Sequence, residues 1–147
     1  MELVVDFNRG NFDKVINNDL GSYFGNMDVL ITIREANDEL WIGSNFHQVF
    51  IRDLFYRLDR LYKNKTPFYI ETWGNGDFYY FCIYKDSMII EKNNKEKIMC
   101  SSRQFQDKLI DAMDNYFSKL LKLNPSVVNH VGYTTLRDYT MWGHNSD

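Results

Sequence analysis

The segment from Pro67 to Cys100 places aromatic and aliphatic side chains at a spacing of two residues. Because side chains alternate between the two faces of a strand, this spacing predicts β-structure rather than helix. Turn residues divide the segment, at Gly74-Asn75-Gly76 and at Lys85-Asp86. The pattern therefore predicts an antiparallel meander with strands at Phe68–Trp73, Phe78–Tyr84, Met88–Glu91 and Ile98–Cys100.

A helix is expected on each side of this meander. The first begins near Ser44 or Asn45, either of which is a good N-cap, and ends before Pro67. Its apolar residues recur at helical spacing: Phe46, Phe50, Leu54, Leu58 and Leu61. The second helix follows the capping box Ser101-Ser102-Arg103-Gln104 and ends at Asn124-Pro125.

The remaining segments complete an α+β pattern. We expect a strand at Leu3–Phe7, a loop with a short helix near Phe12–Asn17, and a last short helix at Thr135–Met141. A β-hairpin is predicted from Asp28–Arg34 and Glu39–Gly43. The order hairpin, helix, meander, helix predicts an antiparallel sheet with the helices packed on one face. With 147 residues and no linker-like segment, a single globular domain over residues 1–147 is expected.

The first residues and the short apolar runs favour a cytoplasmic location. The first residues carry an acid where a signal peptide needs basic residues, and the apolar runs are too short to cross a bilayer. Cys82 and Cys100 are expected to be two buried, reduced thiols.

No motif for catalysis or cofactor binding is present in the sequence. The histidines (His47, His130 and His144) are far apart in sequence, and the cysteines do not form a zinc motif, so neither a metal nor a cofactor is expected. The chain is therefore expected not to be an enzyme. An unrecognised hydrolase would need Glu71 and Glu91, the strand acids best placed to be fixed in position, to converge in a cleft.

Charge is distributed unevenly, with a formal net charge of −3. Residues 1–45 contain eight acidic and three basic side chains, which disfavours nucleic acid and favours basic partners. Within this third, four acids bracket one tryptophan, an arrangement typical of protein-binding sites. These candidate contacts are Asp28, Glu35, Asp38, Glu39 and Trp41. The alternative, with Trp41 in the core of a solvated hairpin, stays open.

A second candidate surface lies on the meander. Alternation places Tyr69, Glu71 and Trp73 on one face of their strand and Phe68 on the other, and either Tyr79 or Tyr80 joins the first set. Whether the chain termini cover this face is open, since antiparallel sheets commonly leave one face wet.

The strand Phe78–Tyr84 is similar to the aromatic strand of RNA-recognition domains. Asp77 stands where those domains carry a basic residue, and the order of strands and helices differs. Together with the acidic composition, this argues against RNA binding.

The order of elements resembles that of small bacterial immunity proteins, which neutralise a cognate toxin delivered by a neighbouring or sibling cell. The resemblance covers residues 27–125 and rests on Phe46–Leu61, Trp73-Gly74, Phe78–Tyr84, Ser101–Leu121 and Asn124-Pro125. It implies a single acidic cytoplasmic α+β domain without catalytic residues.

We therefore expect a protein-binding module, an immunity or antitoxin-like inhibitor that occludes the active site of a basic toxin domain. The alternative is a small-ligand-binding or regulatory domain, in which the aromatic sheet and the first long helix enclose a pocket. A homodimer through the aromatic face is compatible with both.

Overall fold

The computed structural model describes residues 1–142, and its strands form two antiparallel sheets. The first sheet contains β1 (Glu2–Phe7), β2 (Asp28–Glu35) and β3 (Asp38–Asn45), in that order. The second is a meander of β4 (Phe68–Glu71), β5 (Phe78–Tyr84), β6 (Ser87–Lys92) and β7 (Glu96–Ser101). The α+β class is thus confirmed, with the strands divided between two sheets.

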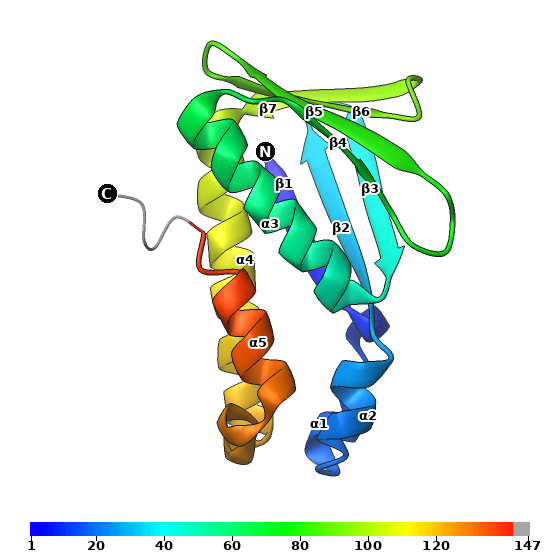
Figure 1. Ribbon diagram of the computed structural model, residues 1–147, viewed down its shortest axis with the longest axis vertical. Coiled ribbons are helices and arrows are strands. Elements are labelled where there is room, and N and C mark those ends of the chain that lie inside the picture. The colour runs from blue at the N-terminus through cyan, green and yellow to red at the C-terminus, as the bar shows by residue number, and fades with distance from the viewer. Residues whose placement is uncertain (143–147) are drawn as a thin grey trace.

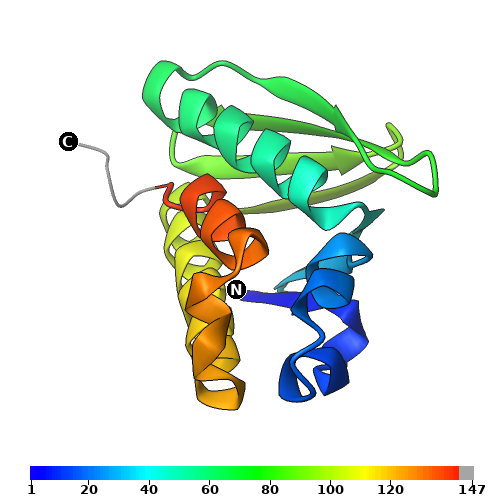
Figure 2. The ribbon, with the colours of Figure 1, turned by 60° about the horizontal axis from the view of Figure 1, so that its bottom comes forward.

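Two long helices lie on the same side of the first sheet (Figure 1). They are α3 (His47–Asn64) and α4 (Ser102–Leu123). The shorter helices are α1 (Asp13–Ile16), α2 (Leu20–Gly25) and α5 (Val131–Tyr139), with 3-10 turns η1 (Asn8–Gly10) and η2 (Pro125–Asn129). Figure 1 shows the second sheet lying across the ends of β2 and β3. Figure 2 shows α5 lying against α4 and α3.

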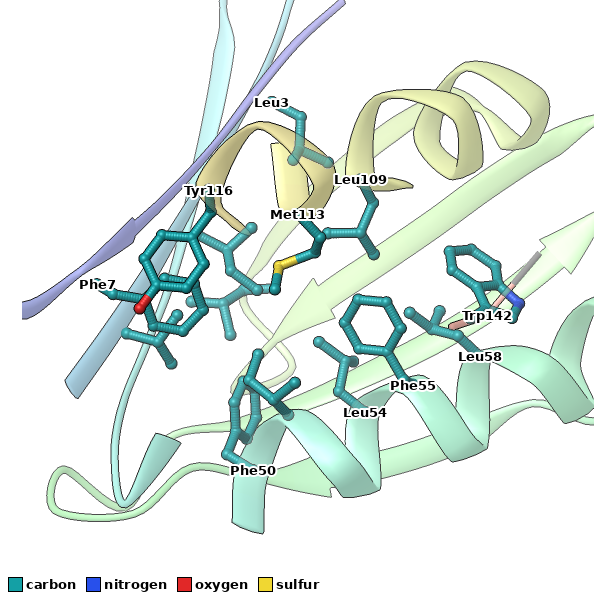
Figure 3. Packing of buried hydrophobic residues seen from close by; sticks show 14 of the residues in the cluster. Leu3, Phe7, Phe50, Leu54, Phe55, Leu58, Leu109, Met113, Tyr116 and Trp142 are labelled. Atoms are coloured by element: carbon teal, nitrogen blue, oxygen red, sulfur yellow. The ribbon is translucent and has the colours of Figure 1, made fainter. Parts of the chain in front are cut away.

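The core lies between the helices and the inner faces of both sheets. Figure 3 shows the apolar side of α3, with Phe50, Leu54 and Leu58, turned toward Met113 of α4 and Leu3 of β1. These side chains are almost completely buried, as the helical spacing predicted. Trp142, beyond α5, also packs into this cluster and is 6% exposed.

The predicted caps have different outcomes at the two long helices. The Ser101 hydroxyl accepts a hydrogen bond from the Gln104 amide at 3.2 Å, as predicted for α4. The prediction that Ser44 or Asn45 caps α3 is wrong. Phe46 is the N-cap, in a left-handed conformation with φ 52°, because Ser44 and Asn45 still belong to β3.

Several element boundaries differ from the sequence prediction. The loop expected from Asn8 to Asn26 contains a second short helix, α2, whose residues Leu20, Tyr23 and Phe24 enter the core. The last helix begins at Val131 rather than Thr135 because His130 caps it, its Nδ1 accepting from the Gly132 amide at 3.0 Å. β4 ends at Glu71, so Trp73 lies in a loop and not on the strand.

Candidate functional site

The helix-free side of the first sheet carries an exposed apolar cluster. The alternation along β2 and β3 buries Ile31, Ile33 and Leu40 and turns their neighbours to the other face. We call that other face the outer face of the first sheet. Its residues are Glu2, Val4, Asp6, Asp28, Leu30, Thr32, Arg34, Glu39, Trp41 and Gly43.

Strand register arranges these side chains in rows across the sheet. Val4, Thr32 and Trp41 stand side by side in one row. Leu30 stands in the next row, over Gly43, so that its methyl group would lie 3.6 Å from a Cβ at that position. Val4, Leu30 and Trp41 are 44%, 39% and 54% exposed, respectively. Leu30 is thus the diagonal neighbour of both Val4 and Trp41, and the three make up an apolar patch around Thr32, of the kind found at the centre of protein interfaces.

A charged row borders this patch. Arg34 stands between Glu2 and Glu39 and contacts their carboxylates at 2.7 and 3.2 Å. The indole N–H of Trp41 also donates to Glu39, at 2.5 Å. These hydrogen bonds, the one from Trp41 first, hold the pKa of the Glu39 carboxyl below its usual range. The carboxylate therefore stays ionised and orients the indole ring.

Side chains of the second sheet hold β3 in place by bonding to the outward-facing carbonyl groups of β3. The Trp41 carbonyl accepts from the Tyr79 hydroxyl at 2.9 Å and from the Lys92 ammonium at 3.3 Å. The Gly43 carbonyl accepts from the side-chain Nδ2 of Asn75 at 3.1 Å. An edge strand normally leaves such groups to solvent, so these contacts cover part of the β3 edge and fix the backbone that carries Trp41.

The predicted acidic ring around Trp41 is divided by the structure. Glu39 lies beside Trp41, but Glu35 and Asp38 flank the hairpin turn, where Glu35 lies 3.8 Å from the amino group of Met1. Asp28 lies at the opposite end of β2, seven residues from Glu35 and roughly 23 Å away along the strand. The spacing in the sequence did not show that the whole of β2 separates Asp28 from Glu35, Asp38 and Glu39.

Asp28 instead meets a residue of the second predicted surface. Asp28 and Trp73 both line a pocket of about 300 Å³ at the end of the outer face. Arg9 lies 3.9 Å from the Asp28 carboxylate. The Trp73 loop reaches this position because the Trp73 amide donates to the Ser44 hydroxyl and its carbonyl accepts from the Asn45 amide, both at 3.0 Å.

The second predicted surface is exposed, and its three residues, Tyr69, Glu71 and Trp73, line one hollow beside α3. Tyr69 is 60% exposed, and Tyr80 joins it, with the two ring centroids 4.7 Å apart; Tyr79 is buried. Trp73 lies in the loop between β4 and β5; it is 49% exposed, and its ring centroid lies 5.5 Å from that of Phe46. Tyr69 and Glu71 thus share a strand face, and Trp73 lies in the loop that follows, where the two sheets meet.

Two of the alternatives can be placed in the structure. Glu71 and Glu91 share a sheet face but stand on strands separated by β5 and in different rows, roughly 12 Å apart, so they do not converge. The alternative of a ligand pocket between the aromatic sheet and the first long helix corresponds to an open hollow of about 820 Å³ between α3 and the β4 side of the second sheet. Phe68 and Phe81 do not line it; they stack on each other in the core at 4.8 Å.

The described residues, 1–142, contain no group of three or more His, Cys, Asp or Glu side chains placed to hold a metal ion; His144 lies outside them. Cys100 is buried, but Cys82 is only half-buried, on the outward side of the second sheet, so the expectation of two buried thiols is half right. None of the helices in this part of the chain is long and apolar enough to cross a membrane.

Sequence reasoning missed Glu2, Val4, Leu30 and Arg34. The alternation of Ile31 and Ile33 already placed Leu30 on the opposite face of β2. What it did not supply was the register of β1 on β2, which brings Val4 and Glu2 beside the hairpin. Comparison of the chain with protein-family models, with curated proteins and with solved structures finds no match in any of the three.

Proposed function

We propose that this chain is a protein-binding module of the immunity or antitoxin kind, which inhibits a cognate toxin by covering the toxin's active site. The observation that carries the proposal is the outer face of the first sheet. There, exposed Val4, Leu30 and Trp41 form an apolar patch, and acidic side chains border it. An aromatic anchor with polar groups around it is the usual anatomy of an energetic hot spot.

The patch is suited to occlusion because it is rigid. Trp41 is held by its hydrogen bond to Glu39, and its backbone is held by Tyr79 and Lys92. A preformed surface loses little conformational entropy on binding, so more of the contact energy appears as affinity. A flat sheet face of this kind covers a site on the partner without entering it.

Charge favours a basic partner. The outer face carries Glu2, Asp6, Asp28 and Glu39 against Arg34, and the whole chain has a formal net charge of −3. Complementary charge accelerates encounter and is screened by salt, whereas the buried aromatic contact slows dissociation. We therefore propose a cytoplasmic complex with a basic toxin domain, without nucleic acid or cofactor and without catalysis by this chain.

The test uses the product of the adjacent reading frame as the candidate toxin. Co-expression of this chain is expected to protect cells from that product and to give a one-to-one complex on gel filtration. Leu30→Arg places a charge in the centre of the patch and is expected to abolish both protection and complex formation.

Met99→Arg is the matched control, because Met99 is an exposed apolar strand residue, 50% accessible, on the second sheet. It is expected to leave protection intact. Circular dichroism establishes that both variants are folded. Loss of binding with Met99→Arg and not with Leu30→Arg, or toxicity unaffected by this chain, would overturn the proposal.

A further inference from the structure

β4 has a free edge on the side that faces away from β5. β4 is the first strand of the second sheet and pairs only with β5 within the described chain. The Thr72 amide donates to the Asp77 carbonyl at 2.9 Å. In an antiparallel ladder, hydrogen-bonded residues alternate, so Phe68 and Ile70 bond to β5 and the residues between them do not.

The backbone N–H and C=O groups of Tyr69 and Glu71 therefore point away from the sheet. Among residues 1–142, no protein group makes a hydrogen bond to these four atoms. This differs from β3, where Tyr79, Lys92 and Asn75 satisfy the outward carbonyls. The chain thus satisfies outward carbonyls of β3 and leaves those of β4 unpaired.

The free edge faces a groove whose opposite wall is α3. Asp53 and Arg57 of α3 and residues 69–74 line a hollow of about 820 Å³. A second hollow of about 350 Å³ continues past Arg57 to Tyr56, Arg60 and Pro67. Because an extended strand needs a trench beside the edge it joins, these two hollows provide the space.

The helix wall of the groove is basic. Asp53 is neutralised by Arg52, at 3.3 Å. Within residues 1–142, Arg57 and Arg60 form no ion pair with a carboxylate, and the Arg60 guanidinium instead lies over the Tyr56 ring and bonds its hydroxyl at 3.1 Å. The two arginines are three residues apart, about 4.5 Å along the helix axis, and so lie on one side of α3.

We infer that the β4 edge binds an extended acidic segment of a partner protein as an additional strand. Its backbone pairs with Tyr69 and Glu71, and two carboxylates at alternate positions, roughly 6.7 Å apart, face Arg57 and Arg60. A second copy of this chain fits the groove less well, because it would bring another arginine-bearing α3 to the same place. This site is distinct from the outer face of the first sheet and takes the opposite charge.

The experiment uses a defined probe, the capped peptide acetyl-Thr-Glu-Val-Glu-Val-amide, titrated into the isotopically labelled full chain. Binding is expected with a dissociation constant below about 1 mM. The amide signals of Tyr69 and Glu71 are expected to shift and to gain protection from hydrogen exchange. The same peptide with lysine in place of glutamate is expected to bind at least about tenfold more weakly.

Two pairs of variants separate charge from backbone pairing. Arg57→Glu is expected to weaken binding about tenfold or more, whereas Arg103→Glu, at an exposed arginine of α4, leaves it unchanged. Tyr69→Pro removes an outward N–H that the fold does not use, and is expected to weaken binding about tenfold relative to Tyr69→Ala. A peptide N-methylated at its central valine is expected to lose binding even if Tyr69→Pro does not fold.

The inference is overturned if the peptide does not bind at millimolar concentration, if its shifts fall on the outer face around Trp41, or if Arg57→Glu has no effect. It is also overturned if light scattering shows a dimer that Tyr69→Pro abolishes, because the edge is then occupied by a second copy.

Discussion

At the scale of single residues, His47, the first residue of α3, is a buried titratable side chain with an unpaired nitrogen. It is 2% exposed and lies edge-on to Phe7, with ring centroids 5.8 Å apart. A hydrogen bond links it to the Met27 backbone, but Nε2 has no partner within the described residues. Burial lowers the pKa of His47 from 6.5 to about 4, so the folded protein holds this imidazole neutral.

This burial predicts a loss of stability in weak acid. Because the folded pKa lies below the unfolded value, the unfolded chain binds a proton first as the pH falls. The contribution is complete above pH 6.5 and is lost as the pH falls toward 4. It amounts to on the order of 3 kcal/mol in the free energy of unfolding. Urea unfolding at several pH values measures it.

His47→Asn keeps a short hydrogen-bond donor but does not titrate. This variant is expected to be less stable at pH 7, since it leaves a cavity, and to lose most of the pH dependence between 6.5 and 4. If the free energy of unfolding of this variant falls with pH as steeply as that of the wild type, other groups cause the acid sensitivity.

Residue-scale inference from the sequence succeeded where alternation alone decides. It placed Phe68 and Ile70 inside and Tyr69 outside, and the structure agrees. It left Trp41 open between core and surface, because the pattern does not say which face of the hairpin the helices cover. It also assigned Trp73 to a strand, although Thr72 already bonds Asn75 and Asp77 to start the turn.

At the scale of elements, the packing of α5 on α2 depends on a glycine. Gly132 stands at the second position of α5, where a Cβ would lie 2.5 Å from Cγ of the Phe24 ring. His130, which caps the helix, stacks on the same ring with centroids 5.3 Å apart. Neither α2 nor this close approach was evident from the sequence, in which residues 8–26 contain few apolar anchors.

Gly132→Ala is therefore expected to destabilise the protein. The added methyl forces Phe24 or α5 to move, and this overpacking outweighs the gain in helix propensity by about 1–2 kcal/mol. Gly21→Ala, in α2, is the matched control, because a Cβ at Gly21 would meet no atom within 4 Å. It is expected to be neutral or slightly stabilising, and denaturant midpoints compare the two; equal midpoints would contradict the packing argument.

At the scale of the whole molecule, the second sheet has two roles. Its inner face completes the core with Tyr79, Phe81 and Ile90, all buried, and its polar groups cover part of the β3 edge. The first sheet then keeps its helix-free face exposed, and the second sheet keeps an open edge at β4. One fold thereby presents an acidic, apolar face and a groove with a basic helix wall, separated at Trp73, which lines both hollows.

The sequence predicted the class of the fold but not its division into two sheets. Period-two alternation and turn residues identify each strand and its two faces, because these are local properties. Which strands pair, and which edge is covered, depends on contacts such as Tyr79 with Trp41 that join distant segments. Glu39 and Trp41 are two residues apart on one strand, so the sequence grouped them correctly. Asp28 was wrongly grouped with acids that lie at the far end of its strand.

The most direct test of the proposed function is the affinity of the Trp41→Ala variant for the product of the adjacent reading frame, the candidate toxin. Trp41→Ala is expected to raise the dissociation constant by about 30-fold or more, mainly by faster dissociation, as removal of a hot-spot residue does. Glu39→Lys is expected to slow association and to reduce its salt dependence. A complex that forms with unchanged affinity in both variants would show that the outer face of the first sheet is not the binding site.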